Sequence, residues 1–213
     1  MRPLTDRTPK PLLTVAGTPL IDRHLRALAH AGMTSVVVNL SWLGAQIRAH
    51  LGDGARYGVH VQYSEEGPVP LETGGGIFRA LPLLGPDPFL VINGDVWTDY
   101  PLGQLNAARV RESDAHLVLV PNPPQHPRGD FALSAAHVCE DGEPRLTYSG
   151  IGLFRPEFFS SCSDGRFPLL PLFRRAIARG RLTGEAYEGQ WSDIGTPERL
   201  ASLDSRVRIE SSA

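Results

Sequence analysis

Strand-like and helical segments alternate over the first 120 residues, and this alternation is the strongest constraint on the fold. Aliphatic and β-branched runs at 35–40 (SVVVNL) and 88–95 (PFLVINGD) are typical of buried strands, and residues 115–120 (AHLVLV) are strand-like. Apolar residues recur at helical spacing within residues 19–31, 42–51, 75–84 and 102–112. Strands joined through helices by short links are typical of βαβ units. The sequence therefore predicts an α/β fold with a doubly wound, mostly parallel, Rossmann-like sheet.

Residues 121–213 are less regular, but they contain no segment with the composition of a linker. Strands are predicted in RGDFALS, AAHVCE and RLTYSGIGLF, and two short ones in RLTGEAYEGQWSDIG. A helix is predicted at 169–179, and another at 197–207 behind Thr196 as N-cap and Pro197 as first residue. We therefore expect a single domain over residues 1–213.

Composition excludes several classes of function. The formal net charge is -2 with no basic block, so nucleic-acid binding through phosphate neutralisation is not expected. Cys139 and Cys162 lie far apart without metal-ligand spacing, which predicts two free thiols and no structural zinc. No apolar run is long enough for a signal peptide or a membrane span, so we expect a cytoplasmic protein.

Two segments have residues that suit phosphate binding. Residues 2–12 hold Lys10 in a proline-rich stretch, where a lysine is either a point charge for phosphate or part of a plain connection. Residues 71–76 (LETGGG) precede a helix, so their glycines either let a ligand approach the backbone or form a flexible turn. For each segment taken alone, the structural interpretation is the more common one.

Two further segments each offer a carboxylate. Asp95 follows a strand in Asn93-Gly94-Asp95, and ligands of open α/β sheets bind beyond the carboxyl ends of the strands. Asp193 lies in WSDIGTP, between two short elements. If folding brings Asp193 close to Asp95, their mutual repulsion would be relieved by a divalent cation such as Mg²⁺. The alternative is that each aspartate is an ordinary turn residue.

In this order, the segments resemble one superfamily, the sugar-1-phosphate nucleotidyltransferases. Residues 2–12 match the Arg-x-Pro-Leu-Thr and Pro-Lys-Pro parts of its N-terminal signature, and residues 15–21 (VAGTPLI) match the stretch that follows. Four further segments fall in the expected order: LETGGGIF, VINGDVWTD, YSGIGLF and WSDIGTPERL. The resemblance thus covers essentially the whole chain, and its details look most like the N-acetylmuramate-1-phosphate uridylyltransferases of cell-wall recycling.

The resemblance implies a role for each segment. Lys10 matches the signature lysine that contacts phosphates, and Asp95 and Asp193 match the two aspartates that hold Mg²⁺. The residues expected to carry catalysis are Lys10, Arg2 and Asp95. The implied nucleotide-binding residues are Lys10, Glu72, Thr73, Gly74, Gly75 and Asn93, within a nucleotide-binding part at 1–120. The implied sugar-phosphate-binding residues are Gly129, Asp130, Ser149, Gly150 and Glu185, within a part at 121–213.

The resemblance also implies partners, with alternatives left open. The expected substrates are a nucleoside triphosphate, UTP before the thymidine or guanosine analogues, and a sugar 1-phosphate. No nucleic acid or membrane partner is expected, and both a monomer and a dimer are compatible with the sequence. The alternative functions are a glucose- or mannose-1-phosphate nucleotidyltransferase and a non-catalytic nucleotide-binding regulatory module.

The N-terminus departs from the family pattern. Members of the superfamily open with a strand and a Gly-x-Gly-x-Arg loop that cradles the triphosphate, and both would precede Met1. We therefore expect a sheet that lacks the usual first strand. We also expect a working protein about a dozen residues longer, the size of the missing strand and loop.

Overall fold

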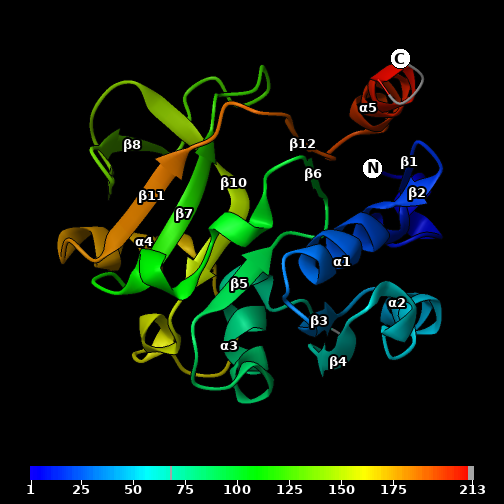
Figure 1. The fold of residues 1–213 in the computed structure, drawn as a ribbon, viewed down its shortest axis with the longest axis horizontal. Coiled ribbons are helices and arrows are strands. Elements are labelled where there is room, and N and C mark those ends of the chain that lie inside the picture. The colour runs from blue at the N-terminus through cyan, green and yellow to red at the C-terminus, as the bar shows by residue number, and fades with distance from the viewer. Residues whose placement is uncertain (68, 211–213) are drawn as a thin grey trace. The chain divides into compact units, whose positions relative to one another are not determined.

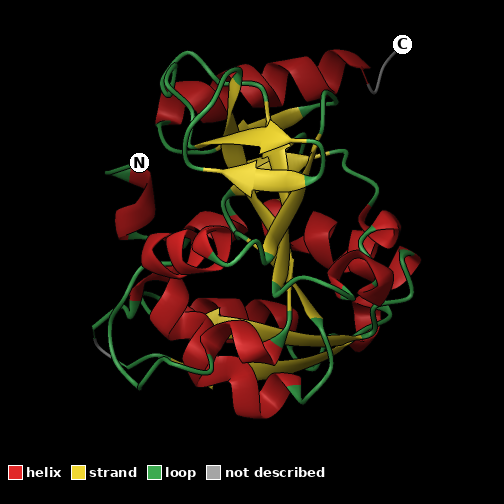
Figure 2. Ribbon diagram, turned by 90° about the vertical axis from the view of Figure 1, so that its left-hand side faces the viewer, coloured by secondary structure: helices red, strands yellow, loops and turns green. Residues whose placement is uncertain are grey.

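The structure is a computed structural model that describes residues 1–67 and 69–210. These residues form both helices and strands, as Figures 1 and 2 show. The α-helices are α1 (Leu20–His30), α2 (Gly44–Leu51), α3 (Glu72–Leu84), α4 (Leu170–Ala178) and α5 (Pro197–Glu210). The strands are β1 (Thr14–Val15), β2 (Thr18–Pro19), β3 (Ser35–Leu40), β4 (His60–Glu65), β5 (Phe89–Ile92), β6 (Val96–Thr98), β7 (Ala115–Val120), β8 (Phe131–Ser134), β9 (His137–Cys139), β10 (Arg145–Phe154), β11 (Leu182–Ala186) and β12 (Trp191–Asp193).

The chain forms two compact units that interleave along the sequence. The first unit contains Met1–Pro70, Gly94–Gly103 and Trp191–Ala213, and the second contains Leu71–Asn93 and Gln104–Gln190. The single domain with parts that divide after residue 120 stays a prediction. Residues from the two ends of the sequence thus belong to the same unit, which matters for the site described below.

The first unit is built around a βαβ element. Strands β3 and β4 pair in parallel through α2, from Ser35 opposite His60 to Leu40 opposite Glu65. This is the arrangement that the strand and helix pattern predicts. The apolar faces of α1 and α2 pack with these strands around a core that consists of Ile21, Leu25, Leu40, Ile47, Leu51, Tyr57, Val59 and Val61.

A second core of the first unit joins residues from both ends of the sequence. Strands β1 and β2 form a small antiparallel hairpin, and β6 pairs antiparallel with β12. Helix α5 packs on this hairpin, where Asp204 accepts a hydrogen bond of 2.7 Å from the backbone N–H of Ala16. The core residues are Val15, Leu20, Trp97, Ile194, Leu203 and Val207.

The second unit contains a six-stranded sheet in the order β5-β10-β7-β11-β9-β8. Strand β7 is buried along its whole length and is parallel to β11, whereas β10 is antiparallel to β5, β7 and β8. Strand β8 is antiparallel to β9, which follows it after a short turn, and also to β10. Parallel pairing, which the sequence favours throughout, is confined to β3–β4 and β7–β11 among the described residues. The sheet is mixed.

Several elements differ from the sequence-based expectation. The helix predicted over residues 102–112 is wrong: the segment forms two 3₁₀ turns, Leu102–Gln104 and Ala107–Val110. Between the turns, Asn106 has an extended backbone and its side chain accepts the N–H of Ala108 at 3.0 Å, which interrupts a continuous helix. Strands β3 and β5 are half-buried rather than buried on both faces, because each pairs with one strand among the described residues.

Two helix starts also differ. Helix α3 begins at Glu72, so the three glycines form part of its first turns instead of a loop before it. Helix α2 begins at Gly44, two residues later than predicted. Within residues 1–67 and 69–210, no helix is both long and apolar enough to cross a membrane.

Candidate active site

Lys10 and Asp95 meet in the first unit, although 85 residues separate them in the sequence. The Nζ atom of Lys10 lies 3.0 Å from Oδ2 of Asp95, and both side chains remain partly open to solvent. The lysine begins the 3₁₀ turn Lys10–Leu12, which Pro9 and Pro11 make rigid. A Cβ atom at Gly94 would lie 3.0 Å from Cγ of Pro11, so the glycine lets this turn pack closely beside Asp95.

Asp95 and Asp193 are brought together by the pairing of β6 with β12. Asp193 lies opposite Val96 in this antiparallel ladder, and the N–H of Ile194 donates a 2.8 Å hydrogen bond to the carbonyl of Asp95. Asp95, directly before β6, and Asp193, the last residue of β12, therefore lie at the same end of one small sheet. The backbones of the two aspartates thus lie close together, and a metal site shared by their carboxylates stays a prediction.

Asp193 also has a basic partner. Nη1 of Arg199, from the first turns of α5, lies 2.6 Å from both carboxylate oxygens of Asp193. Sequence reasoning missed this arginine, and its position six residues after Asp193 gives no periodic signal of the contact. In the structure each aspartate thus has a basic partner, Lys10 for Asp95 and Arg199 for Asp193.

His24 of α1 supports the strand that follows Asp95. The imidazole hydrogen-bonds to the backbone of Val96, while its Nε2 atom is shielded from solvent without a hydrogen-bond partner among the described residues. Burial lowers the pKa of His24 to about 4, and the Val96 bond and the charge of Asp95 oppose this shift only in part. His24 is therefore neutral at neutral pH and fixes the backbone of the site rather than its charge.

The oxygen-rich pair Asp95 and Asp193 fits a hard divalent cation. Both carboxylates already attract positive groups, and Mg²⁺ is usually held by one or two carboxylates together with phosphate oxygens and water. No group of three or more His, Cys, Asp or Glu side chains that could hold a metal ion occurs in the described part of the chain. A cation here would therefore take its remaining ligands from substrate or solvent.

Arg2, the third residue expected to carry catalysis, is placed differently. Its side chain is 89% exposed, and its Nε atom lies 3.3 Å from Oδ1 of Asp6, one turn further along. An exposed pair of this kind contributes little to stability. No described contact joins Arg2 to Lys10 or Asp95, so its role in catalysis stays a prediction.

The glycines of the predicted nucleotide-binding segment have a packing function in the second unit. The N–H of Gly75 donates to the carbonyl of Phe167 at 3.0 Å, and a Cβ atom on Gly75 would lie 2.1 Å from the carbonyl oxygen of Gly165. A Cβ atom on Gly74 would likewise come within 2.6 Å of the Phe167 ring. The N–H of Gly75 is therefore not available to a ligand.

Glu72 and Thr73 start the same helix and are exposed. Glu72 has a positive φ of 61°, and its Oε1 atom pairs with Arg166 at 2.9 Å. Thr73 presents its side chain to solvent beside it. These two residues, rather than the glycines, have side chains that a nucleotide could reach.

Asn93 and Gly150 pack together where β5 ends against β10. The N–H of Asn93 donates to the carbonyl of Gly150 at 2.9 Å, and a Cβ atom on Gly150, whose φ is 80°, would meet Nδ2 of Asn93 at 2.7 Å. The neighbouring Ser149 is buried, and its hydroxyl donates to the carbonyl of Val118 at 2.7 Å. Ser149 thereby supports the register shift in β10 between Tyr148 and Ile151.

Gly129 and Asp130 hold the loop before β8. A Cβ atom on Gly129 would lie 2.6 Å from the side chain of Asn122, so the glycine permits this close approach. Asp130 accepts the N–H of Tyr148 through Oδ2 at 2.8 Å, and its Oδ1 lies 3.0 Å from Nε2 of His126. Both residues therefore have structural contacts, and their role in binding the sugar phosphate stays a prediction.

Glu185 of β11 is partly buried beside two basic side chains. Its Oε2 atom lies 3.1 Å from Nη2 of Arg109 and 3.7 Å from Nε2 of His116. Burial lowers the pKa of His116, although the Glu185 charge opposes this. A neutral His116 whose Nδ1 accepts the Thr183 hydroxyl at 3.0 Å can point an Nε2–H toward Glu185.

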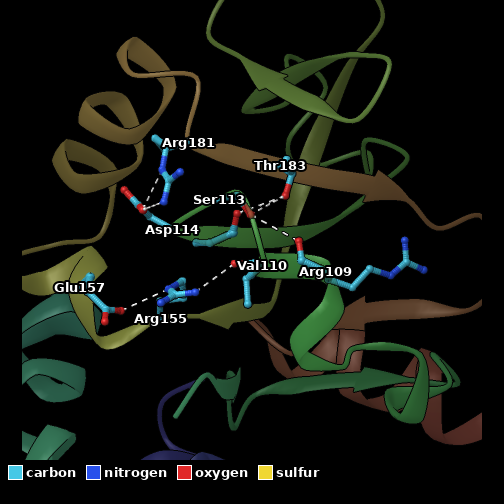
Figure 3. Close-up of polar contacts among 9 residues, drawn as sticks. Arg109, Val110, Ser113, Asp114, Arg155, Glu157, Arg181 and Thr183 are labelled. Atoms are coloured by element: carbon cyan, nitrogen blue, oxygen red, sulfur yellow. Dashed lines mark hydrogen bonds and ion pairs between the residues drawn. The ribbon is translucent and has the colours of Figure 1, made fainter. Parts of the chain in front are cut away.

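The backbone that carries Arg109 is fixed by hydrogen bonds, which Figure 3 shows. The hydroxyl of Ser113 donates to the carbonyl of Arg109 at 3.3 Å, and Nη1 of Arg155 reaches the carbonyl of Val110 at 3.5 Å. Arg155 is itself paired with Glu157 at 3.3 Å. Arg109 was not among the residues that the sequence indicated, because nothing in a linear pattern links it to Glu185.

Comparison with known proteins identifies the family. Residues 1–133, more than half of the chain, match the family model described as nucleotidyl transferase. The chain is 49% identical to the N-acetylmuramate alpha-1-phosphate uridylyltransferase of Neisseria meningitidis serogroup B over 94% of this chain and 90% of that protein. The chain belongs to the nucleotidyl transferase family.

Two further similarities agree with this membership. The chain is 36% identical to the Caulobacter vibrioides protein of the same name, over 97% of this chain and 91% of that protein. A solved structure from Bacillus anthracis, described as a glucose-1-phosphate thymidylyltransferase, superposes with a TM-score of 0.85 at 20% identity over 98% of this chain and 90% of that one. The predicted fold class, α/β of the nucleotide-diphospho-sugar transferase type, is confirmed.

Proposed function

We propose that the chain transfers a uridylyl group from UTP to N-acetylmuramate 1-phosphate, giving UDP-N-acetylmuramate and pyrophosphate. The observation that carries this proposal is the ion pair of Lys10 with Asp95 next to the β6–β12 ladder, which places the backbone of Asp193 beside that of Asp95. The similarity to two N-acetylmuramate alpha-1-phosphate uridylyltransferases supports the choice of substrates. In this proposal the reaction serves cell-wall recycling in the cytoplasm.

The chemistry requires no covalent intermediate with the enzyme. A phosphate oxygen of the sugar 1-phosphate attacks the α-phosphorus of UTP, a new P–O bond forms, and the bond to the leaving pyrophosphate breaks. Both reactants are anions, so the barrier is dominated by charge repulsion and by alignment. The protein can lower it with fixed positive charge and a rigid geometry.

Asp95 and Asp193 would hold the divalent cation, Mg²⁺ in this proposal. When bound, the cation neutralises phosphate charge and aligns the reacting oxygens. Lys10, held by its two prolines, would move its ammonium group over the short distance from Asp95 to a phosphate oxygen. His24, through its bond to the Val96 backbone, would keep Asp95 and its strand in place.

The remaining predicted contacts concern residues of the second unit. In this proposal Glu72 and Thr73 contact the nucleotide and Glu185 contacts the sugar. The side chains of Glu72 and Thr73 are exposed and that of Glu185 is partly exposed, whereas Gly74 and Gly75 are buried. Arg109 and His116 would hold the Glu185 carboxylate in one orientation. Gly74, Gly75, Asn93, Gly129, Asp130, Ser149 and Gly150 would shape the surface through their backbone positions.

A substrate matrix tests the proposal. Pyrophosphate release is measured for UTP, dTTP and GTP, each combined with N-acetylmuramate 1-phosphate, glucose 1-phosphate or mannose 1-phosphate, in the presence of Mg²⁺. We expect the highest kcat/KM for UTP with N-acetylmuramate 1-phosphate. A preference for GTP with mannose 1-phosphate, or for dTTP with glucose 1-phosphate, would move the protein to the alternative activity. Binding of UTP without any turnover would indicate a regulatory module.

A further inference from the structure

Arg199 occupies both oxygens of Asp193, the carboxylate that the proposed function gives to a divalent cation. Its Nη1 atom lies 2.6 Å from each oxygen. The arginine and aspartate side chains are 28% and 35% exposed, so ions and phosphates in solvent can reach the pair. Hydrogen bonds between a guanidinium and a carboxylate are among the stronger ones in proteins.

The local sequence is built to allow this contact. A Cβ atom on Gly195 would lie 1.8 Å from Nη2 of Arg199, so the glycine leaves room for the guanidinium in its observed position. The hydroxyl of Thr196 accepts the N–H of Arg199 at 3.3 Å, which fixes the first turn of α5 in the orientation that aims Arg199 back at β12. The contact therefore follows from the turn and the cap, and it is not a chance meeting of two surface side chains.

A cation and Arg199 compete for the same oxygens. Asp193 cannot give its full negative charge to a metal while a guanidinium 2.6 Å away shares both of its oxygens. Arginine, in turn, matches the geometry of phosphate as well as that of carboxylate. An arginine displaced from Asp193 next to a bound polyphosphate would thus find an equivalent partner within reach.

We propose that Arg199 is a movable counter-charge: it holds Asp193 while the site is empty and transfers its guanidinium to a phosphate group when the cation and nucleotide bind. The inference rests on the proposed role of Asp193 as a metal ligand. Before binding, Lys10 and Arg199 balance the two aspartates in charge. A bound divalent cation adds two positive charges. The negative charges of the nucleotide phosphates then neutralise the cation and the released side chains of Lys10 and Arg199.

The test separates binding of the cation from binding of phosphate. Mn²⁺ affinity is measured by electron paramagnetic resonance without nucleotide, and pyrophosphate affinity by calorimetry at saturating Mn²⁺. We expect Arg199→Gln to bind Mn²⁺ alone roughly two- to fivefold more tightly, because a partly exposed competing pair is removed. We expect the same variant to bind pyrophosphate about tenfold or more weakly, because a charged hydrogen bond is lost.

Matched variants make these opposite shifts interpretable. Arg206→Gln removes another arginine of α5, one that lies over the Trp97 ring at 5.7 Å, and should leave both affinities as in wild type. Arg199→Lys keeps the charge, so its pyrophosphate affinity should lie between those of wild type and Arg199→Gln. Asp193→Asn should lose the Mn²⁺ binding that Arg199→Gln gains. Thermal unfolding of each variant checks that it is folded.

Other outcomes would overturn the inference. Weaker binding of both ligands by Arg199→Gln and Arg199→Lys would mean that the arginine only shapes Asp193, and unchanged binding of both would mean that it does not participate. Formation of UDP-N-acetylmuramate by the wild type is assayed separately. If that product forms while the two shifts are absent, the role of Arg199 fails and the proposed function stands. If the shifts occur without the product, the substrate assignment fails instead.

Discussion

Opposite charges are paired one to one around the two aspartates of the candidate site. Lys10 neutralises Asp95, and Arg199 neutralises Asp193. A carboxylate can exchange its basic partner for a metal cation, and the basic side chain that is released can then pair with a phosphate. The site is thus prepared for anionic substrates although the whole chain has a net charge of only -2.

The first prediction concerns these carboxylates. Asp95→Ala or Asp193→Ala should lower kcat/KM on the order of 10²-fold or more, because each removes a charge that positions the reacting phosphates. The measurement is pyrophosphate release with UTP and N-acetylmuramate 1-phosphate. Asp164→Ala is the control, because Asp164 is 64% exposed in a surface pair with Arg79 and should change the rate less than about twofold. Activity near that of wild type in either site variant would remove that aspartate from the mechanism.

Sequence patterns indicate the candidate residues Lys10, Asp95 and Asp193, whereas no pattern indicates the side chains that pair with Asp193 and Glu185 in the structure. Lys10 and Asp95 stand out because proline-rich turns and strand ends are recognisable in a linear pattern. Arg199 and Arg109 meet Asp193 and Glu185 through a helix start and a 3₁₀ turn whose orientation depends on tertiary packing. Packing also explains why the glycines after Glu72 are structural: the segment at 165–167 that they contact is distant in sequence.

At the scale of elements, α5 is fastened to the β1–β2 hairpin by one carboxylate. Asp204 accepts the N–H of Ala16, a non-glycine residue with φ of 48°, and also pairs with Arg208 at 2.6 Å. The bond to Arg208 and the bond to Ala16 lower the pKa of Asp204. Asp204 therefore links the last helix to residues near the Lys10 turn.

The second prediction follows from this link. Asp204→Ala should lower the Tm and accelerate amide exchange at Ala16, because the N–H of a strained turn loses its acceptor. Asp204→Asn keeps an acceptor oxygen and should lower the Tm less. Circular dichroism and hydrogen exchange with mass spectrometry are the measurements. Equal Tm values for the two variants would show that the charge, and not the hydrogen bond, stabilises the hairpin.

The third prediction concerns the start of α3. Gly75→Ala places a Cβ atom 2.1 Å from the backbone oxygen of Gly165, which no side-chain movement can relieve. We expect a loss of about 1–3 kcal/mol in the free energy of unfolding, as for other overpacked positions. Gly103→Ala is the control, since its Cβ would lie at an ordinary 3.7 Å from Ala31. Equal stabilities in urea denaturation would show that the 165–167 segment yields easily.

Helices and strands were predicted well where the spacing of apolar residues is enough to define them. Helix α1 and strand β7 match the expected segments, because their apolar patterns have a single good solution. Residues 102–112 have enough apolar spacing for a helix, but Asn106 caps a new turn in their middle. The spacing of apolar residues does not reveal that an asparagine side chain can bind the backbone and interrupt a helix.

At the scale of the whole molecule, buried titratable groups limit the pH range of stability on both sides. Burial lowers the pKa of His24 to about 4 and also lowers that of His116. Burial raises the pKa of three phenols, those of Tyr57, Tyr63 and Tyr148. In every case the folded protein prefers the neutral form. Protonation of the histidines or ionisation of the tyrosines therefore favours the unfolded chain.

The fourth prediction applies this to acid unfolding. Between pH 6.5, where an unfolded histidine protonates, and about pH 4, where His24 protonates in the fold, the unfolded state binds more protons. The contribution of His24 to the free energy of unfolding is therefore fully present above pH 6.5. It decreases by about 3 kcal/mol as the pH falls through this window. Urea unfolding at a series of pH values measures the slope of the free energy of unfolding against pH. At high pH the tyrosines act in the opposite sense, and stability should fall above about pH 10.

His24→Gln tests whether this residue is responsible, because glutamine can keep a donor near the Val96 backbone but cannot be protonated. Its overall stability at pH 7 can be lower than that of wild type, but the loss between pH 6.5 and pH 4 should shrink. His30→Gln changes an exposed histidine on the same helix and should leave the slope unchanged. A slope that survives in His24→Gln would move the acid sensitivity to His116, the other histidine whose pKa is lowered by burial. The two histidines belong to different units, so local hydrogen exchange at acid pH would then identify which unit opens first.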